Sequence, residues 1–134
     1  MQITRQADYA VRAIMYLAQI GADQKAATSQ IAEDQDIPLS FLAKIIAQLS
    51  VAGLLQTMRG ARGGVSLARN PDEISLLEVV EAIDGPILLN ECVNGAHICT
   101  VENCPLQGVW HEAQDDLVGR LKTTNFGQFV NGHI

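Results

Sequence analysis

Long apolar runs are absent from this chain of 134 residues. No stretch approaches the roughly 18 consecutive apolar residues that a membrane span needs. The N-terminal sequence MQITRQADYA also lacks the apolar segment of a secretory signal. We therefore expect a soluble, cytoplasmic protein that has no membrane partner.

Cysteine is scarce, and all three copies lie in one stretch, ECVNGAHICTVENCPLQ. Three thiols cannot all pair with one another, so a closed set of disulfides would leave one thiol over. In a reducing compartment, clustered cysteines are more often ligands or redox groups than structural bridges. Cys92, Cys99 and Cys104 therefore indicate a shared ligand.

Known catalytic motifs are absent as well. The sequence contains no Gly-rich phosphate loop, no HExxH motif and no GxSxG motif. A nucleophilic cysteine needs a nearby base, and the local pair is Cys99 with His97. We therefore expect no enzyme. A structural metal-binding interaction module is the other class to be tested against a regulator.

The chain also lacks net positive charge, since nine basic and 15 acidic residues give a net charge of −6. This excludes a protein that coats nucleic acid by bulk attraction. The charge is unevenly divided, however. Residues 1–70 hold seven basic and five acidic residues, a net of +2, whereas residues 71–134 have a net of −8. Only the N-terminal half is suited to approach a polyanion.

What the chain does contain is enough apolar sequence for one domain, and three helices are predicted first. The first covers residues 4–20, with Thr4 as its N-cap. Thr28 or Ser29 can cap a short second helix, and Pro38 suits the first turn of a third helix. The predicted buried face of the third helix consists of Phe41, Leu42, Ile45, Ile46 and Leu49.

A β-hairpin is predicted next, because LLQTM and VSLA are short extended runs on either side of the turn sequence RGARGG. Ser75 and Glu78 then form a capping box at the start of a helix that ends at Asp84-Gly85-Pro86. A last helix can run from Pro105 to about residue 123. Its predicted apolar stripe consists of Leu106, Val109, Trp110, Ala113, Leu117 and Leu121.

The expected fold is therefore mainly α with a small β-hairpin wing. We expect a winged helix-turn-helix DNA-binding domain over residues 1–85 and a cysteine-containing loop over residues 86–104. Residues 105–134 would form a long dimerisation helix and a C-terminal tail. In a winged helix the third helix enters the major groove and the wing lies along the DNA backbone.

The candidate DNA contacts follow from this arrangement. A helix that contacts bases presents short polar and basic groups near its N-terminal end, which favours Ser40 and Lys44 over Gln48. In the wing, two arginines stand among glycines that permit close approach to phosphate. The alternative, a solvated turn and surface lysine, is less consistent with the three preceding helices. The predicted DNA-binding set is Thr28, Ser29, Ser40, Lys44, Gln48, Arg59 and Arg62.

Four features together resemble the Rrf-two (BadM-type) family of bacterial winged-helix regulators over about residues 1–125. They are ADYAVRAIMYLA, IPLSFLAKIIAQLSVAGLL, RGARGGVSLARNPDEISLLEVVEAIDGP and the three cysteines. The resemblance implies a homodimer that binds a palindromic operator in double-stranded DNA. Since the family includes iron–sulfur and nitric-oxide sensors, it also implies an iron–sulfur cluster, of the 4Fe-4S or 2Fe-2S type, that sets operator affinity.

The same resemblance implies Cys92, Cys99 and Cys104 as cluster ligands. Their spacing, C-x6-C-x4-C, displaces the middle thiol by one position from the pattern common in the family. Some members take a fourth ligand from a histidine at the position that here holds Gln107, which is a poor ligand for iron. That histidine ligand therefore does not carry over.

Other members use a carboxylate from the first helix of the partner subunit, which implies Asp8 as the fourth ligand. His97 in the loop and His111 on the last helix are the local alternatives. Zinc held by the thiolates and a histidine or aspartate also remains open, although the usual C-x2-C pairs are absent. A cluster-free thiol-redox switch on the same fold is the remaining alternative.

Overall fold

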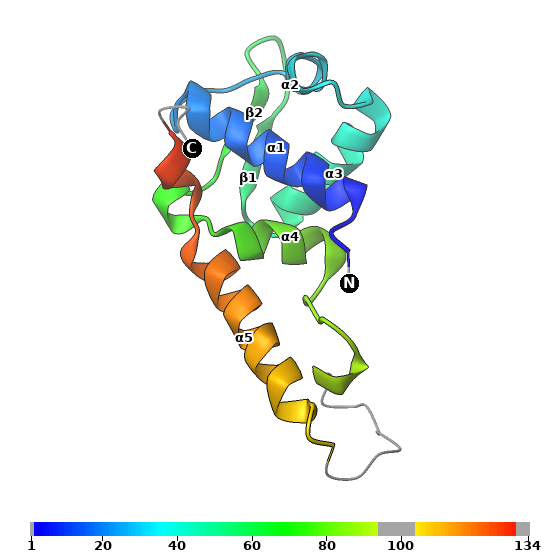
Figure 1. Cartoon of the computed structure of the whole chain (residues 1–134). Coiled ribbons are helices and arrows are strands. Elements are labelled where there is room, and N and C mark those ends of the chain that lie inside the picture. The colour runs from blue at the N-terminus through cyan, green and yellow to red at the C-terminus, as the bar shows by residue number, and fades with distance from the viewer. Residues whose placement is uncertain (1, 94–103, 131–134) are drawn as a thin grey trace.

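The computed structural model describes residues 2–93 and 104–130 (Figure 1). It confirms the mainly helical fold with a two-stranded wing. The helices are α1 (Arg5–Ile20), α2 (Thr28–Gln35), α3 (Leu39–Val51), α4 (Leu76–Asp84) and α5 (Gln107–Thr123). The strands are β1 (Leu55–Met58) and β2 (Gly64–Leu67), and the 3-10 turns are η1 (Pro71–Glu73), η2 (Glu91–Val93) and η3 (Phe126–Phe129). A membrane crossing needs a longer or more apolar helix than any that these residues form.

Two helix caps agree with the predictions. Thr4 caps α1, because its hydroxyl accepts the backbone N–H of Ala7 at 3.1 Å. Ser75 caps α4 in a full capping box, in which the Ser75 hydroxyl and the Glu78 carboxylate each accept the other's backbone N–H at 3.1 Å. Burial raises the pKa of Glu78, but the Ser75 N–H and the neighbouring Arg69 outweigh it, so the pKa is lowered overall.

Three helix starts differ from the predictions. The N-cap of α2 is Ala27, so Thr28 and Ser29 lie in the first turn and neither is the cap. Pro38 is the N-cap of α3 and lies just before its first turn. Helix α5 begins at Gln107, two residues after the predicted start. Such shifts are expected, because helix ends depend on local hydrogen bonds that apolar periodicity does not specify.

One apolar core joins α1, α2, α3, the hairpin and α4. Its largest fully buried side chains are Ile14, Leu17, Ile31, Leu42, Ile45, Leu49, Leu54, Ile74 and Val79. Within the described residues no polar or charged residue is buried. Removal of apolar surface from water is therefore the main force that holds these elements together.

Phe41 is a correction to the predicted core, because this residue is 51% exposed. Successive residues of a helix are rotated by about 100°. With Leu42, Ile45, Ile46 and Leu49 facing the core, Phe41 is turned to the flank of α3. The apolar character of Phe41 suggested a core residue, but its angular position decides the exposure.

The wing is a short hairpin that a third segment supports. Strands β1 and β2 are antiparallel, with Leu55 opposite Leu67. Ala26, in the loop between α1 and α2, bridges Val65 of β2 through backbone hydrogen bonds of 3.0 and 2.7 Å. An isolated two-stranded hairpin is only marginally stable. The bridge and the buried side chain of Val65 therefore fix the wing to the helical part.

The wing turn requires glycine at specific places. A Cβ atom at Gly63 would overlap the backbone carbonyl oxygen of Met58. Gly60 has a φ of 97°, a left-handed backbone conformation that residues with a Cβ atom rarely adopt. The glycines of RGARGG thus allow a tight turn that holds both arginines at the tip.

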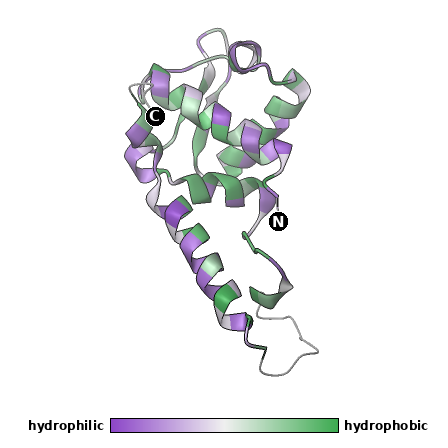
Figure 2. Cartoon of the chain, viewed as in Figure 1, coloured by the Kyte–Doolittle hydropathy of each residue, from purple (hydrophilic) through white to green (hydrophobic). Residues whose placement is uncertain are grey.

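Helix α5 projects away from the winged helix (Figure 1), and its predicted apolar stripe is divided between two environments. Near its C-terminal end, Leu117 and Leu121 pack against a second apolar cluster of Ala7, Val80 and Ile87. Near its N-terminal end, Leu106, Val109 and Trp110 are all exposed in the single chain. Figure 2 shows the contrast, since α4 is hydrophobic along most of its length and α5 is mixed.

The chain beyond α5 returns to the winged helix, which we did not predict. Phe126 of η3 is buried in the main core. Its N–H donates to the carbonyl of Ile74 at 3.2 Å, and the N–H of Leu76 donates to the carbonyl of Thr124 at 2.8 Å. The C-terminal turn is therefore part of the same core as α1 and the start of α4.

We predict that Ser75→Ala lowers the free energy of unfolding by about 1 kcal/mol, the usual cost of removing an N-cap side chain. Because the pKa of Glu78 is lowered in the folded protein, its contribution is present above the unfolded-state pKa and is lost as the pH falls through the folded-state pKa. The Ser75 backbone N–H and Arg69, which cause most of this lowering, both remain in Ser75→Ala, so the difference between the two proteins should change little in acid. Urea titrations at neutral and acidic pH measure both effects.

Ser29→Ala is the matched control, since Ser29 is exposed in the first turn of α2 and its helix has no side-chain cap bond. It should change the stability by less than about 0.5 kcal/mol. Equal losses for both variants would contradict the role of the capping box.

Candidate nucleic-acid interface and cysteine segment

The outward face of α3 consists of residues at helical spacing opposite the core. They are Ser40, Ala43, Lys44, Ala47 and Val51, and all five are exposed. Val51 is 91% exposed, which is unusual for an apolar side chain without a partner. The two predicted base contacts, Ser40 and Lys44, thus lie on one open face.

Gln48 is half-buried and turned to the side of α3. With Phe41 and Lys44 it lines a groove, whose opposite wall includes Thr4 and Asp84. The backbone N–H of Thr4 donates to the Asp84 carboxylate at 3.2 Å, and its hydroxyl donates to the same group. This contact joins the start of α1 to the end of α4, immediately before the chain leads to the cysteine segment.

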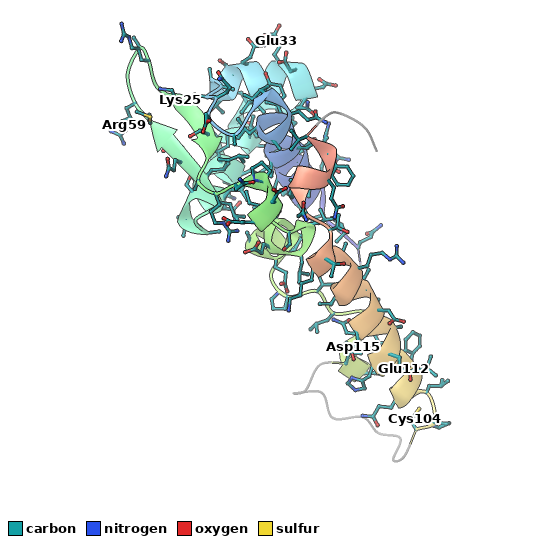
Figure 3. All side chains as sticks on the ribbon, turned by 90° about the vertical axis from the view of Figure 1, so that its left-hand side faces the viewer. Lys25, Glu33, Arg59, Cys104, Glu112 and Asp115 are labelled. Carbon is teal, nitrogen blue, oxygen red and sulfur yellow. The ribbon has the colours of Figure 1, made fainter. Side chains whose placement is uncertain are left out.

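The wing carries its cations at the tip, where Arg59 and Arg62 are exposed. Lys25, from the loop between α1 and α2, adds a third, because its Nζ donates to the backbone carbonyl of Arg62 at 2.8 Å. Figure 3 shows Lys25 and Arg59 at the hairpin and Cys104 at the opposite end of the molecule. The cations of the N-terminal half of the sequence thus lie at the end of the molecule away from Cys104.

Two ion pairs occur among the described residues, Arg12 with Asp8 at 3.2 Å and Arg69 with Glu78 at 2.9 Å. Neither includes a cation of the wing. Unpaired cations on a projecting hairpin generate a local positive potential, even in a protein of net negative charge. That potential is the expected footprint of a phosphate-binding surface.

Asp8 lies on the exposed side of α1 and is linked to the helix-turn-helix through Arg12. The Arg12 guanidinium also donates to the carbonyl of Gln35 at 2.8 Å, and it lies 5.0 Å from the centroid of the Tyr9 ring. Gln35 ends α2, and Asp36 after it adopts a φ of 53° in the turn toward α3. Asp8 is therefore connected, through Arg12 and the Gln35 carbonyl, to the turn that positions α3.

A second contact joins the same two helices. The Tyr16 hydroxyl donates to the Asp34 carboxylate at 2.7 Å. This hydrogen bond raises the pKa of Tyr16, with smaller effects from burial and from the negative charge of Asp34. Tyr16 and Arg12 together fix α2 against α1 near the turn.

The cysteine segment follows residues 85–90, which connect α4 to η2 and which we call the strap. Helix α5 holds the strap in place. The side-chain amide of Gln114 accepts the N–H of Leu89 at 2.9 Å and donates to the carbonyl of Ile87. Cys92, in η2, donates its N–H to the Asn90 side chain at 3.0 Å. Cys104 lies just before α5, where its carbonyl accepts the N–H of Gln107 at 3.2 Å. Both thiols are half-buried, and within the described part of the chain neither forms a disulfide.

The predicted ligand set is only partly covered by the structure, because Cys99 and His97 lie outside the described residues. Within the described ranges, no three histidine, cysteine or acidic side chains are placed to hold a metal ion. Asp8 therefore does not join Cys92 and Cys104 in one protomer, and neither does the exposed His111. Cys92 and Cys104 carry thiols that can bind a metal or a cluster, and if Asp8 is a further ligand it would have to come from a second chain.

Sequence reasoning missed three residues of these sites, namely Arg12, Lys25 and Gln114. Arg12 stands at i+4 from Asp8, so the helical spacing could have revealed the pair. Lys25 and Gln114 both contact backbone carbonyls of distant segments. No periodicity or motif marks such contacts.

Comparison with known proteins agrees with this arrangement. Residues 3–132 match the family model of Rrf2, described as an iron-dependent transcriptional regulator. The HTH-type transcriptional regulator NsrR of Shouchella clausii (strain KSM-K16) is 36% identical over 115 residues, which cover 84% of this chain and 77% of that protein.

Two solved structures show the same fold. CymR (YrzC), the global cysteine regulator of B. subtilis, superposes with a TM-score of 0.82 at 20% identity, covering 100% of this chain and 99% of that one. IscR of T. potens superposes with a TM-score of 0.77 at 23% identity, covering 99% and 89%. The family match over nearly the whole chain and the 36% identity to NsrR decide the assignment, and the chain belongs to the Rrf2 family of DNA-binding transcriptional regulators.

Proposed function

We propose that this chain is a cytoplasmic, homodimeric regulator whose affinity for a palindromic operator is set by an iron–sulfur cluster. Cys92, Cys99 and Cys104 would hold the cluster, with Asp8 of the partner subunit as fourth ligand. The observation that carries this proposal is the link from the exposed Asp8 through Arg12 to the carbonyl of Gln35. It connects a candidate ligand to the turn that positions α3.

The division of the chain supports this function. Residues 1–85 would bind DNA, residues 86–104 would carry the cluster, and residues 105–134 would dimerise and close the core. On the outward face of α3, Ser40 and Lys44 would contact base edges, while the methyl groups of Ala43 and Ala47 suit thymine methyls. Gln48 would reach bases only from the flank.

Phosphate contacts would come from the remaining candidates. Arg59 and Arg62 project from the wing tip, and Thr28 and Ser29 lie in the first turn of α2, where backbone N–H groups are unpaired by the helix. They belong to α2 and to the hairpin, which both pack against α3, and they would orient α3 in the groove. Their contacts add affinity but little sequence preference.

Dimerisation would use the exposed end of α5. Leu106, Val109 and Trp110 present a large apolar surface on one helix end, and such surfaces mark protein interfaces. A two-fold axis there would place two copies of α3 about 34 Å apart, the spacing of successive major grooves on one face of DNA. It would also give each Asp8 access to the cysteines of the partner.

The chemistry of the bound group would supply the signal, because exposed iron–sulfur clusters respond to redox state, nitric oxide and iron supply. The residues of the chain would do the rest. Gln114 holds the strap before Cys92 on α5, and Asn90 orients the Cys92 backbone. Asp8 would either form the ion pair with Arg12 or bind the cluster of the partner subunit. Loss of the ion pair would change the position of Arg12 and weaken its hydrogen bond to the Gln35 carbonyl. That is a coupling between two sites.

A cluster-free thiol-redox regulator or a zinc-dependent one is the second candidate. Within the described residues, Cys92 and Cys104 are free thiols and no three-ligand group is formed. Either alternative keeps the same DNA interface and the same dimer.

The cluster is tested by purifying the protein without oxygen and measuring iron, acid-labile sulfide and the visible spectrum. We expect about two or about four irons per chain with equal sulfide, as the two cluster types require. Asp8→Ala should lower the retained iron, whereas the control Asp23→Ala, at an exposed aspartate outside α1, should not. Protein with neither iron nor sulfide would overturn the cluster, and stoichiometric zinc would favour the second candidate.

The dimer is tested with Trp110→Glu, which places a charge on the exposed apolar end of α5. Sedimentation velocity should show a dimer for the unmodified protein and mainly monomer for the variant, since an unpaired buried charge is strongly destabilising. Val51→Glu alters an equally apolar, exposed residue on α3 and should remain dimeric. A monomeric unmodified protein would rule out this interface.

The DNA interface is tested on a duplex that the protein selects from a randomised pool. Arg59→Ala/Arg62→Ala should make the dependence of log affinity on log salt shallower by about 1.8, or about 0.9 for each lost phosphate contact. Arg120→Ala, at an exposed arginine of α5, should leave the slope unchanged. An interaction module that does not bind DNA would yield no selected duplex.

A further inference from the structure

Lys25 lies at a junction between two parts of the proposed DNA interface. Its neighbour Ala26 forms the backbone bridge to Val65 of β2, which fixes the main chain of this loop against the wing. Three residues further along the chain, Thr28 begins α2. The loop therefore connects the wing to the first turn of α2, and both are candidates for phosphate contact.

The side chain of Lys25 is directed to the wing tip. Its Nζ donates to the Arg62 carbonyl at 2.8 Å and lies 3.9 Å from the Met58 sulfur. An ammonium group has three donors, so the strong hydrogen bond to Arg62 leaves donors for a further acceptor. Because a free lysine side chain loses rotamer freedom when it is fixed, prior positioning lowers the entropic cost of a contact.

Electrostatics also favour an anion at this place. Lys25, Arg59 and Arg62 are all exposed, and none of them belongs to an ion pair among the described residues. Three unpaired cations gathered at the tip of the wing, two from the hairpin and one from the loop between α1 and α2, repel one another unless an anion lies between them. A DNA phosphate on the wing would relieve that repulsion.

We propose that Lys25 is a third phosphate-contacting cation of the wing, and that its hydrogen bond to the Arg62 carbonyl holds the tip in position for DNA. The inference rests on the proposed DNA interface and adds a residue that lies outside both the helix-turn-helix and the hairpin. Lys25 would make the wing and the start of α2 one continuous phosphate-binding edge.

The test measures salt-dependent binding of the selected duplex to Lys25→Met, which keeps the aliphatic stem and removes the charge. The slope of log affinity against log salt should become shallower by about 0.9. Near 0.15 M salt this corresponds to roughly fivefold weaker binding. Lys25→Arg should retain the slope, since the charge stays. Lys122→Met, at an exposed lysine of α5, should behave like the unmodified protein.

A purely structural role is separated by repeating Lys25→Met in the Arg59→Ala/Arg62→Ala background. If Lys25 contacts phosphate itself, the slope should fall by about 0.9 again. An unchanged slope in that background, or a slope of Lys25→Met equal to that of the unmodified protein, would overturn the inference. The proposed function fails separately, if no duplex is selected or if the arginine variant binds with an unaltered slope.

Discussion

Burial of the apolar face of α1 is the interaction on which the rest of the structure depends. Six residues of this helix are buried: Ala7, Ala10, Ala13, Ile14, Leu17 and Ala18. Helices α2, α3 and α4, strand β2 and the turn η3 all pack against α1. Four of its buried residues are alanines, whose small side chains allow neighbouring backbones to approach closely. The opposite side of the same helix carries Asp8 and Arg12, so the scaffold and the candidate switch share one element.

The folding pattern could be predicted where the determinants are local. The Thr4 cap, the Ser75 box and the glycine-rich turn act over a few residues, and the sequence shows them directly. Phe41 and Phe126 could not be placed in this way. Phe41 is apolar but angularly displaced from the core, and Phe126 is buried only because the chain beyond α5 returns to α1.

The candidate site likewise contains residues that local patterns reveal and residues that only the tertiary structure reveals. Residue type and spacing select Ser40, Lys44 and the wing arginines as candidates, and the structure places them on exposed surfaces, while their contacts with DNA stay predictions. Lys25 and Gln114 act through backbone carbonyls of segments far away in the chain, which only the tertiary structure brings near. Asp8 came from family resemblance, and its link to Gln35 through Arg12 became visible only in the structure. Long-range polar contacts are therefore the part that sequence patterns do not predict.

Among the described residues, helix α5 packs on the winged helix near its C-terminal end, and this gives it the mechanics of a lever. Its C-terminal half packs on α4 and its chain continues into the core, while among the described residues its N-terminal half contacts the η2 turn and the segment just before it. At about 1.5 Å of rise per residue, its 17 residues span roughly 26 Å. A tilt of about 10° over that length displaces the far end by roughly 4 Å. Because Gln114 ties the strap to the same helix, such a displacement pulls on Ile87 and hence on the joint between Asp84 and Thr4. Small movements at the cysteine end would thus reach the Thr4–Asp84 contact, which lines the groove beside α3, the helix proposed to enter DNA.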